Sequence, residues 1–374
     1  MASQAPPRVR PLLSMTVTKP STSVRRSQRL GHGAKAAALA AAPGAPVPTP
    51  KPAPADDLAL EPPPKKARTA KRAPAEPAEE PPLLTREESA LCTTLQQPRL
   101  PFDLDVARAF LCDKDPRFEP LFQQLDLKMY NELRDGELKE LNLFRVLTTS
   151  ILGQQISWLA ARSINYKFCR TFAPHLDEQP DFSTLDREKL PFPTPHDILD
   201  ASDEQLRSAG LSNAKVKYVR DLARRFADGR LDVRRIVHMG HDECIAELTQ
   251  VKGVGRWTAE MMLMFALRFP DVLPVGDLGV QRGMVYFYTS GAQGPVVSDR
   301  KKKQDATVPI EPTDAEAMPL PSANLSHATL RSRAQGNKTK KNMYLDAHEM
   351  EELAAPWAPY RSVASMFMWS LVDN

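Results

Sequence analysis

The chain has 374 residues, and 50 Lys and Arg face 46 Asp and Glu, so the formal net charge is only +4. This balance excludes nucleic-acid binding through total charge alone, although a basic stripe on a near-neutral enzyme would still allow it. No apolar stretch is long enough to cross a membrane, and we expect no membrane association.

The first part of the chain, residues 1–82, is rich in Ala and Pro and shows no sustained apolar periodicity. Such a segment cannot bury enough surface to offset its ordering entropy, so we expect a disordered basic tail. Residues 64–72, Pro-Lys-Lys-Ala-Arg-Thr-Ala-Lys-Arg, resemble a nuclear import signal and predict a nuclear protein. The first acid is Asp56, which leaves a mitochondrial transit peptide as the alternative, but the early prolines would interrupt its helix.

The second part, residues 83–374, is long enough for a sizeable core. Its apolar residues recur at helical spacing and predict an all-α domain. The predicted helices are 105–111, 120–124, 138–147, 158–172, 203–209, 214–226, 242–249, 256–268, 278–288, 346–353 and 361–372. An insert at about 291–341 is rich in Pro, Ser, Ala and Lys, and we expect it to be disordered.

Two Gly-containing turns join predicted helices. In the first, Gly210 is suited to a helix C-cap and Ser212 to the next N-cap. In the second, a helix that starts with Asp242 as N-cap is broken by Gly253 and Gly255 and resumes at Trp257. We interpret residues 242–268 as a helical hairpin whose glycines adopt positive φ and allow close approach of another molecule.

Backbone N–H groups at the start of the second hairpin helix favour an anion, and phosphate is the anion that fits DNA binding. Gly253 and Gly255, with the basic Lys252 and Arg256, are the candidate phosphate ligands. The alternative is an ordinary helical corner in which glycines only make the turn tight.

A single acid, Asp277, follows the hairpin in Pro-Val-Gly-Asp-Leu. Pro274 and Gly276 bend the chain before it, and Leu278 can start a helix, so Asp277 lies at or near an N-cap. The helix dipole stabilises a carboxylate there, and an anion can in turn stabilise positive charge on a substrate. The alternative is that Asp277 only caps its helix.

The hairpin followed by Pro-x-Gly-Asp resembles the signature of the helix-hairpin-helix DNA glycosylases, from about residue 101 to residue 371 except the insert. The resemblance implies two helical lobes with the active site in the cleft between them. It also implies that Asp277 acts as the N-glycosidic bond breaks and positive charge builds on the sugar. Members that also nick the DNA backbone carry Lys where this chain has Trp257, so the resemblance implies a monofunctional glycosylase that uses water.

Trp257 also makes the chain similar to the alkylated-base branch, which is 3-methyladenine DNA glycosylase II-like, and to its fungal-like eukaryotic members. In that branch an aromatic ring stacks on the flipped, positively charged base. Residues 356–362 match the closing motif W-x-P-aromatic-R-S, with Tyr360 at the aromatic position. The implied base pocket is therefore Trp257, Met261 and Tyr360, although some relatives have an aromatic residue where Met261 stands. Arg361 is expected to reach either DNA phosphate or an internal carboxylate.

Residues 144–157 resemble the family's helix–loop–helix that carries the wedge. A base turned out of the duplex leaves a hole, which Gln155 would fill, while Gln154 would bond the orphaned base or nearby backbone. The resemblance also implies a Na⁺ or K⁺ held by the backbone carbonyls of Thr249, Val251 and Val254.

The cysteines predict no metal centre and no disulfide framework, and we expect no required cofactor. They are Cys92, Cys112, Cys169 and Cys244. One branch of the family carries an iron–sulfur cluster on cysteines after the catalytic region, and no cysteine follows Cys244.

The resemblance as a whole implies an enzyme of base excision repair that releases 3-methyladenine and 7-methylguanine from duplex DNA and leaves an abasic site. Its partner would be double-stranded DNA with a damaged base, and it would act as a monomer. The alternative is a DNA-binding helix-hairpin-helix protein without catalysis, which would need neither Asp277 nor the aromatic residues Trp257 and Tyr360.

Overall fold

The computed structural model describes residues 80–125, 127–186, 189–291, 318–339 and 343–373. The predicted tail up to residue 79, its basic run at 64–72, and residues 292–317 of the predicted insert lie outside this described part. Near the start of the described part, the Pro81 carbonyl accepts a hydrogen bond from Arg224 Nη2 at 2.8 Å. The Leu84 N–H then donates to the Ala227 carbonyl at 2.8 Å.

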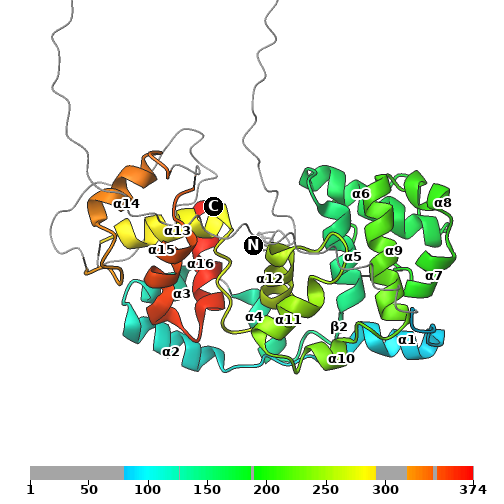
Figure 1. Cartoon of the computed structure of the whole chain (residues 1–374), viewed down its shortest axis with the longest axis horizontal. Helices are drawn as coiled ribbons and strands as arrows, with labels where there is room; N and C mark the ends of the chain where they lie inside the picture. The colour runs from blue at the N-terminus through cyan, green and yellow to red at the C-terminus, as the bar shows by residue number, and fades with distance from the viewer. Residues whose placement is uncertain (1–79, 126, 187–188, 292–317, 340–342, 374) are drawn as a thin grey trace, which may run out of the picture. The chain divides into compact units, whose positions relative to one another are not determined.

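Most described residues are helical, and the helices pack in two groups (Figure 1). The first lobe comprises α1 (Arg86–Thr93), α5 (Leu143–Gly153), α6 (Trp158–Phe172), α7 (Pro195–Asp200), α8 (Asp203–Ser208), α9 (Asn213–Ala227) and α10 (Val233–Ile236). The second lobe comprises α2 (Leu104–Lys114), α3 (Phe118–Gln124), α13 (Leu278–Thr289), α14 (His327–Ala334), α15 (Ala347–Ala354), the short 3-10 helix η2 (Ala355–Trp357) and α16 (Arg361–Asp373).

The hairpin consists of α11 (His241–Leu248) and α12 (Arg256–Phe265), and α12 also packs on α5 of the first lobe. Helix α4 (Lys128–Arg134) lies in the segment that leads from α3 of the second lobe to α5 of the first lobe. The chain therefore begins in the first lobe, crosses to the second for α2 and α3, returns for α5 to α12, and ends in the second lobe (Figure 1).

A two-stranded antiparallel sheet joins the segment after α1 to the segment before α5. Strand β1 (Thr94–Gln96) pairs with β2 (Glu140–Asn142) in the register Leu95 to Leu141. The prediction of a mostly helical domain is confirmed, but the predicted helix at 138–147 is wrong in its first residues. Asn142 is instead the N-cap of α5, and its side chain accepts from the Arg145 N–H at 2.8 Å.

Side-chain caps explain why several helices begin where they do. Ser157 and Ser212 accept at 3.3 Å from the third backbone N–H of α6 and α9, respectively. The C-cap of α8 is Ala209, and Gly210, predicted as the C-cap, follows it with φ +96° in the left-handed region. Short helices α1, α4, α7 and α10 were not predicted, although Thr194 and Asp197 form a capping box at α7.

The predicted disorder of the insert does not hold for residues 318–339. Helix α14 packs on α13, and its Leu330 is fully buried. Arg333 makes a bidentate ion pair with Glu349 of α15, at 2.6 and 2.8 Å. This part of the insert is held by the buried Leu325 and Leu330, by the ion pair of Arg333, and by hydrogen bonds from Ser322 and Asn324 to Glu352, which composition alone did not reveal.

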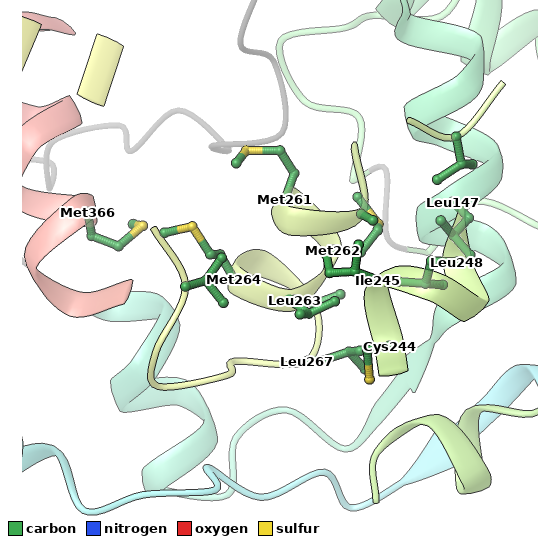
Figure 2. Packing of buried hydrophobic residues seen from close by; sticks show 14 of the residues in the cluster. Leu147, Cys244, Ile245, Leu248, Met261, Met262, Leu263, Met264, Leu267 and Met366 are labelled. Atoms are coloured by element: carbon green, nitrogen blue, oxygen red, sulfur yellow. The ribbon is translucent and has the colours of Figure 1, made fainter. Parts of the chain in front are cut away.

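The core of the hairpin region is formed by sulfur-containing and aliphatic side chains of α11 and α12. Figure 2 shows Met264 of α12 directed toward Met366 of α16, while Met261 points away from the group around Cys244 and Leu267. Flexible Met side chains fill irregular gaps, which suits the meeting of a hairpin with a helix of the other lobe. No described helix has the length and apolar character needed to cross a membrane.

Candidate active site

Asp277 is the N-cap of α13, and three N–H groups from three parts of the chain hold its carboxylate. Oδ1 accepts from the Val280 backbone N–H at 2.9 Å and from the Trp369 indole N–H at 2.8 Å. Oδ2 accepts from the Trp257 indole N–H at 2.9 Å. The side chain is 8% exposed, so these hydrogen bonds act where water screens little. The cap reading of Asp277 is therefore correct, but capping explains only one of the three bonds.

Trp369 of α16 is the site residue that the sequence did not indicate. A Cβ at Gly279 would lie 2.7 Å from Trp369 Cδ1, so only glycine lets the indole reach the carboxylate. One turn on, a Cβ at Gly283 would lie 2.1 Å from the Met368 carbonyl oxygen, so the two glycines bring α16 against α13. The partners Trp369 and Asp277 are 92 residues apart, a separation at which no local pattern links them.

The three residues predicted for the base pocket differ in their surroundings. Trp257 is half-buried and fixed to Asp277 by its N–H. Met261, one turn further along α12, is 6% exposed and belongs to the main core. Tyr360 packs its ring against Phe102 at 5.8 Å and Phe110 at 5.4 Å. The structure thus brings Trp257 to Asp277 and places Tyr360 in an aromatic group of the second lobe.

The hairpin turn depends on Gly253 but not on the conformational freedom of Gly255. Gly253 has φ +84°, and a Cβ there would lie 2.3 Å from Tyr218 Cδ2 of α9. Gly255 has φ −90°, so the prediction of a positive φ at this residue is wrong. Gly240, rather than the predicted Asp242, is the N-cap of α11, and Asp242 lies in its first turn.

Gly255 is the N-cap of α12 and leaves the helix N-terminus open. It makes no side-chain cap, and no heavy atom lies within 4 Å of the position that a Cβ would take. Arg256 follows with a side chain 63% exposed. A helix start without a side-chain cap and with an exposed cation beside it has the chemistry of an anion site.

Asp221 of α9 holds the rest of the turn. It accepts from the Lys252 backbone N–H at 2.9 Å and lies 3.4 Å from Lys252 Nζ, whose side chain is 68% exposed. At the predicted cation ligands, the Val254 N–H donates to the Val251 carbonyl at 3.0 Å, and Thr249 is the C-cap of α11. The Val251 carbonyl thus already accepts one N–H group, and these contacts leave the expected Na⁺ or K⁺ untested.

The two predicted wedge residues have different environments. Gln154 Nε2 donates to the Gly253 carbonyl at 2.9 Å and ties the loop after α5 to the hairpin. Gln155 is exposed and has φ +60°, a strained value for a residue with a side chain. Lys215 supports the same loop from α9, because its Nζ donates to the Leu152 carbonyl at 2.7 Å.

Glu260 of α12 is a second buried acid that sequence reasoning missed. It is 3% exposed, and its Oε1 accepts from Arg256 Nε at 2.9 Å. Burial raises the pKa of the Glu260 carboxyl above its ordinary value, Arg256 and His241 lower it, and the charge of Asp277 raises it. The spacing of Arg256 and Glu260, four residues along a helix, was a signal that could have identified the pair.

A pocket of about 390 Å³ adjoins this region. It is lined from the hairpin by His241 and Arg256, from the loop before Asp277 by Val275, and from the second lobe by Glu351 and Arg361. Arg361 forms a bidentate ion pair with Asp271, at 2.5 and 2.8 Å, so the internal carboxylate is the partner that the structure shows. No cluster of three or more His, Cys, Asp or Glu side chains in the described residues could hold a metal.

Comparisons with known proteins agree with this geometry. Residues 148–307 match the HhH-GPD superfamily of base excision DNA repair proteins. DNA-3-methyladenine glycosylase 1 of Schizosaccharomyces pombe is 37% identical over 98 residues, which cover 26% of this chain and 43% of that protein. The DNA-3-methyladenine glycosylase of Saccharomyces cerevisiae is 25% identical over 275 residues, which cover 72% of this chain and 80% of that protein.

Among solved structures, a DNA-3-methyladenine glycosidase from Bacillus halodurans matches with a TM-score of 0.43 and 24% identity, over 74% of this chain and 90% of that one. The first of the sequence relatives is thus matched over less than half of its length. The match to the superfamily includes the hairpin and Asp277, and the fungal relatives extend it. Residues 148–307 are therefore similar to the HhH-GPD superfamily of base excision DNA repair proteins, and fungal 3-methyladenine DNA glycosylases are among the relatives of the chain.

Proposed function

We propose that this protein is a monofunctional DNA glycosylase that hydrolyses the N-glycosidic bond of alkylated purines, such as 3-methyladenine and 7-methylguanine, in duplex DNA. The observation that carries the proposal is the buried Asp277 carboxylate held by Trp257, Trp369 and the Val280 N–H. The names of the fungal relatives support the substrate class.

The hydrogen bonds of Asp277 leave it free to act on a substrate. A carboxylate oxygen offers about two lone-pair sites, and Oδ1 already accepts two N–H groups. Oδ2 accepts one, so its remaining site can face the sugar or hold a water molecule. All three donors are neutral, so they orient the carboxylate without cancelling its charge. That charge stabilises the cationic sugar that forms as the base leaves.

A cationic base is a better leaving group than a neutral one because it departs as a neutral molecule. For such bases an enzyme must recognise the cationic base and place an anion near the sugar, whereas protonation of the leaving base by a general acid is less important. Trp257 supplies an aromatic ring beside that anion, and a ring face attracts a positively charged methylpurine.

The same residue argues against strand cleavage. A glycosylase that also nicks DNA attacks the sugar with an amine. The position next to Asp277 is occupied by the Trp257 indole, whose nitrogen donates its proton to the carboxylate and has no nucleophilic lone pair. Water is therefore the proposed nucleophile, and an abasic site the product.

Duplex DNA would be held by the hairpin and opened by the loop after α5. The open start of α12, with Arg256 and Lys252 beside it, would bind phosphate, and the exposed Gln155 would enter the stack as the base turns out. A Na⁺ or K⁺ on the carbonyls of the hairpin turn would add positive charge near that phosphate.

The proposal is tested by base release from methylated duplex DNA with wild-type protein and with Asp277→Asn. We expect wild type to release methylpurines and to leave sites that break only after alkali treatment, with no adduct trapped by borohydride. Asp277→Asn should retain DNA binding and lose release, since the amide keeps the shape but not the charge. DNA binding by wild type without release of any damaged base would instead establish the non-catalytic alternative.

A further inference from the structure

Arg256 and Glu260 form an ion pair whose two ends have very different access to solvent. The guanidinium side chain is 63% exposed and lies at the open start of α12, whereas the carboxyl side chain is 3% exposed. Their Nε–Oε1 distance is 2.9 Å. The buried partner depends on the exposed one, because a buried carboxylate without a cation or donor is costly.

The exposed end is also where DNA phosphate would arrive. Arg256 is the first residue of α12, whose N-cap Gly255 provides no side-chain hydrogen bond, and the space where a Cβ of Gly255 would lie is open. Arginine binds phosphate through paired N–H groups, and when the Nε–H and one Nη–H form that pair, the guanidinium gives up its bond to Glu260.

We propose that Glu260 and a DNA phosphate compete for the Arg256 guanidinium, so that binding of duplex DNA is linked to uptake of a proton by Glu260. The inference rests on the proposed function only in requiring that the hairpin binds DNA. In the free protein the carboxylate pairs with Arg256. In the complex the guanidinium pairs with phosphate, and the carboxylate takes one proton from solvent and becomes a neutral acid.

The other charges around Glu260 favour this exchange. Asp277, at the N-cap of α13, disfavours a second negative charge nearby, and burial already raises the pKa of Glu260. His241, at the start of α11, favours the carboxylate only when it is itself protonated, and its ring nitrogen lies 2.9 Å from Asp242. Neutralising Glu260 on binding would therefore leave Asp277 as the single acid at the centre of the bound site.

Proton uptake can be measured directly with full-length protein and a short undamaged duplex, so that no base release is required. Isothermal titration in buffers of different ionisation enthalpy gives the number of protons taken up per complex. We expect up to one proton for wild type and none for Glu260→Gln. The association constant of wild type should fall by up to about tenfold per pH unit across the range in which Glu260 ionises, and that of Glu260→Gln should not.

Two further variants serve as controls for the role of Glu260. Glu247→Gln makes the same change in α11, where the carboxylate pairs with Arg235 at 2.6 Å, and it should behave as wild type. Arg256→Ala combined with Glu260→Gln removes both partners without leaving a buried charge. It should bind DNA more weakly, take up no proton, and show a salt dependence reduced by about 0.9 in log–log slope.

Equal proton uptake by wild type and Glu260→Gln would overturn the proposal and assign the proton to another group. Uptake by neither protein would overturn it as well. Absence of any DNA binding by wild type would refute the proposed function itself. That result is distinct from DNA binding without proton uptake.

Discussion

Gly253 and Gly255 stand two residues apart in the same turn, yet the structure predicts opposite consequences for their replacement by Ala. At Gly253 a side chain must adopt φ +84°, which costs about 1–2 kcal/mol, and its Cβ must displace Tyr218 from 2.3 Å, which costs about 1–3 kcal/mol. The sum is about 2–5 kcal/mol, which corresponds to a fall in Tm of about 4–20 °C for a domain of this size.

Gly255→Ala is the matched control. Its φ of −90° suits any residue and its Cβ would meet nothing, so its cost is that of a poorer N-cap, below about 1 kcal/mol. The same methyl group would occupy the space where phosphate should approach, so DNA affinity should fall while Tm holds. For Gly253→Ala the order is reversed, because the primary effect is on stability.

Thermal and urea unfolding of Gly253→Ala, Tyr218→Ala and the double variant separate the two costs. Removing the ring should relieve the collision but not the backbone strain, so Gly253→Ala should cost about 1–3 kcal/mol less in the Tyr218→Ala background. The reasoning is refuted if Gly253→Ala unfolds like wild type, or if its cost is the same with and without the ring.

Three further predictions concern the surroundings of Asp277. Trp369→Phe removes one donor to Asp277, and a hydrogen bond to a charged group contributes about 1.5–3 kcal/mol. We therefore expect kcat for methylpurine release to fall about 10- to 150-fold while DNA affinity is kept. An unchanged kcat would contradict the role of Trp369 in positioning the carboxylate. Burial raises the pKa of Glu260, so the stability that its protonated form contributes is present at low pH and is lost as pH rises through the folded-state pKa. Glu260→Gln should therefore raise Tm more at about pH 8 than at about pH 5, and the reverse order would contradict the direction of this pKa shift. Ser362→Ala leaves the buried Val272 N–H without the hydroxyl that accepts from it at 2.9 Å. Urea unfolding should then show that the free energy of unfolding falls by about 1–3 kcal/mol. An unchanged midpoint would mean that another acceptor replaces the hydroxyl.

Local signals account for most of what the sequence predicted correctly. The hairpin was found because helical periodicity, its interruption at Gly253 and its return after Gly255 all lie within thirty residues. Asp277 was found because an N-cap is a property of four consecutive residues, and Val280 is indeed one of its donors. The resemblance to a family then supplied what the spacing could not, which was the chemistry expected at that cap.

The missed features depend on contacts across long separations or on weak local patterns. Trp369 reaches Asp277 over 92 residues, and only the three-dimensional packing at Gly279 reveals why. The helix at α14 has a single fully buried anchor, Leu330, so its sequence shows little periodicity. The short helices α1, α7 and α10 begin at residues with side-chain caps, whereas α4 does not, and four to eight residues are too few for a periodic pattern to stand out.

The dependence of Asp277 on α16 has a consequence for how activity is lost under mild stress. The bonds from Val280 and Trp257 span 3 and 20 residues, whereas the bond from Trp369 requires the docking of a helix that packs against α13. Proteins open in cooperative segments of different free energy, and a segment held mainly by long-range packing can detach before the whole domain unfolds. Hydrogen exchange in α16 would then report the fraction of molecules in which the hairpin remains folded but Asp277 is no longer held by its third donor.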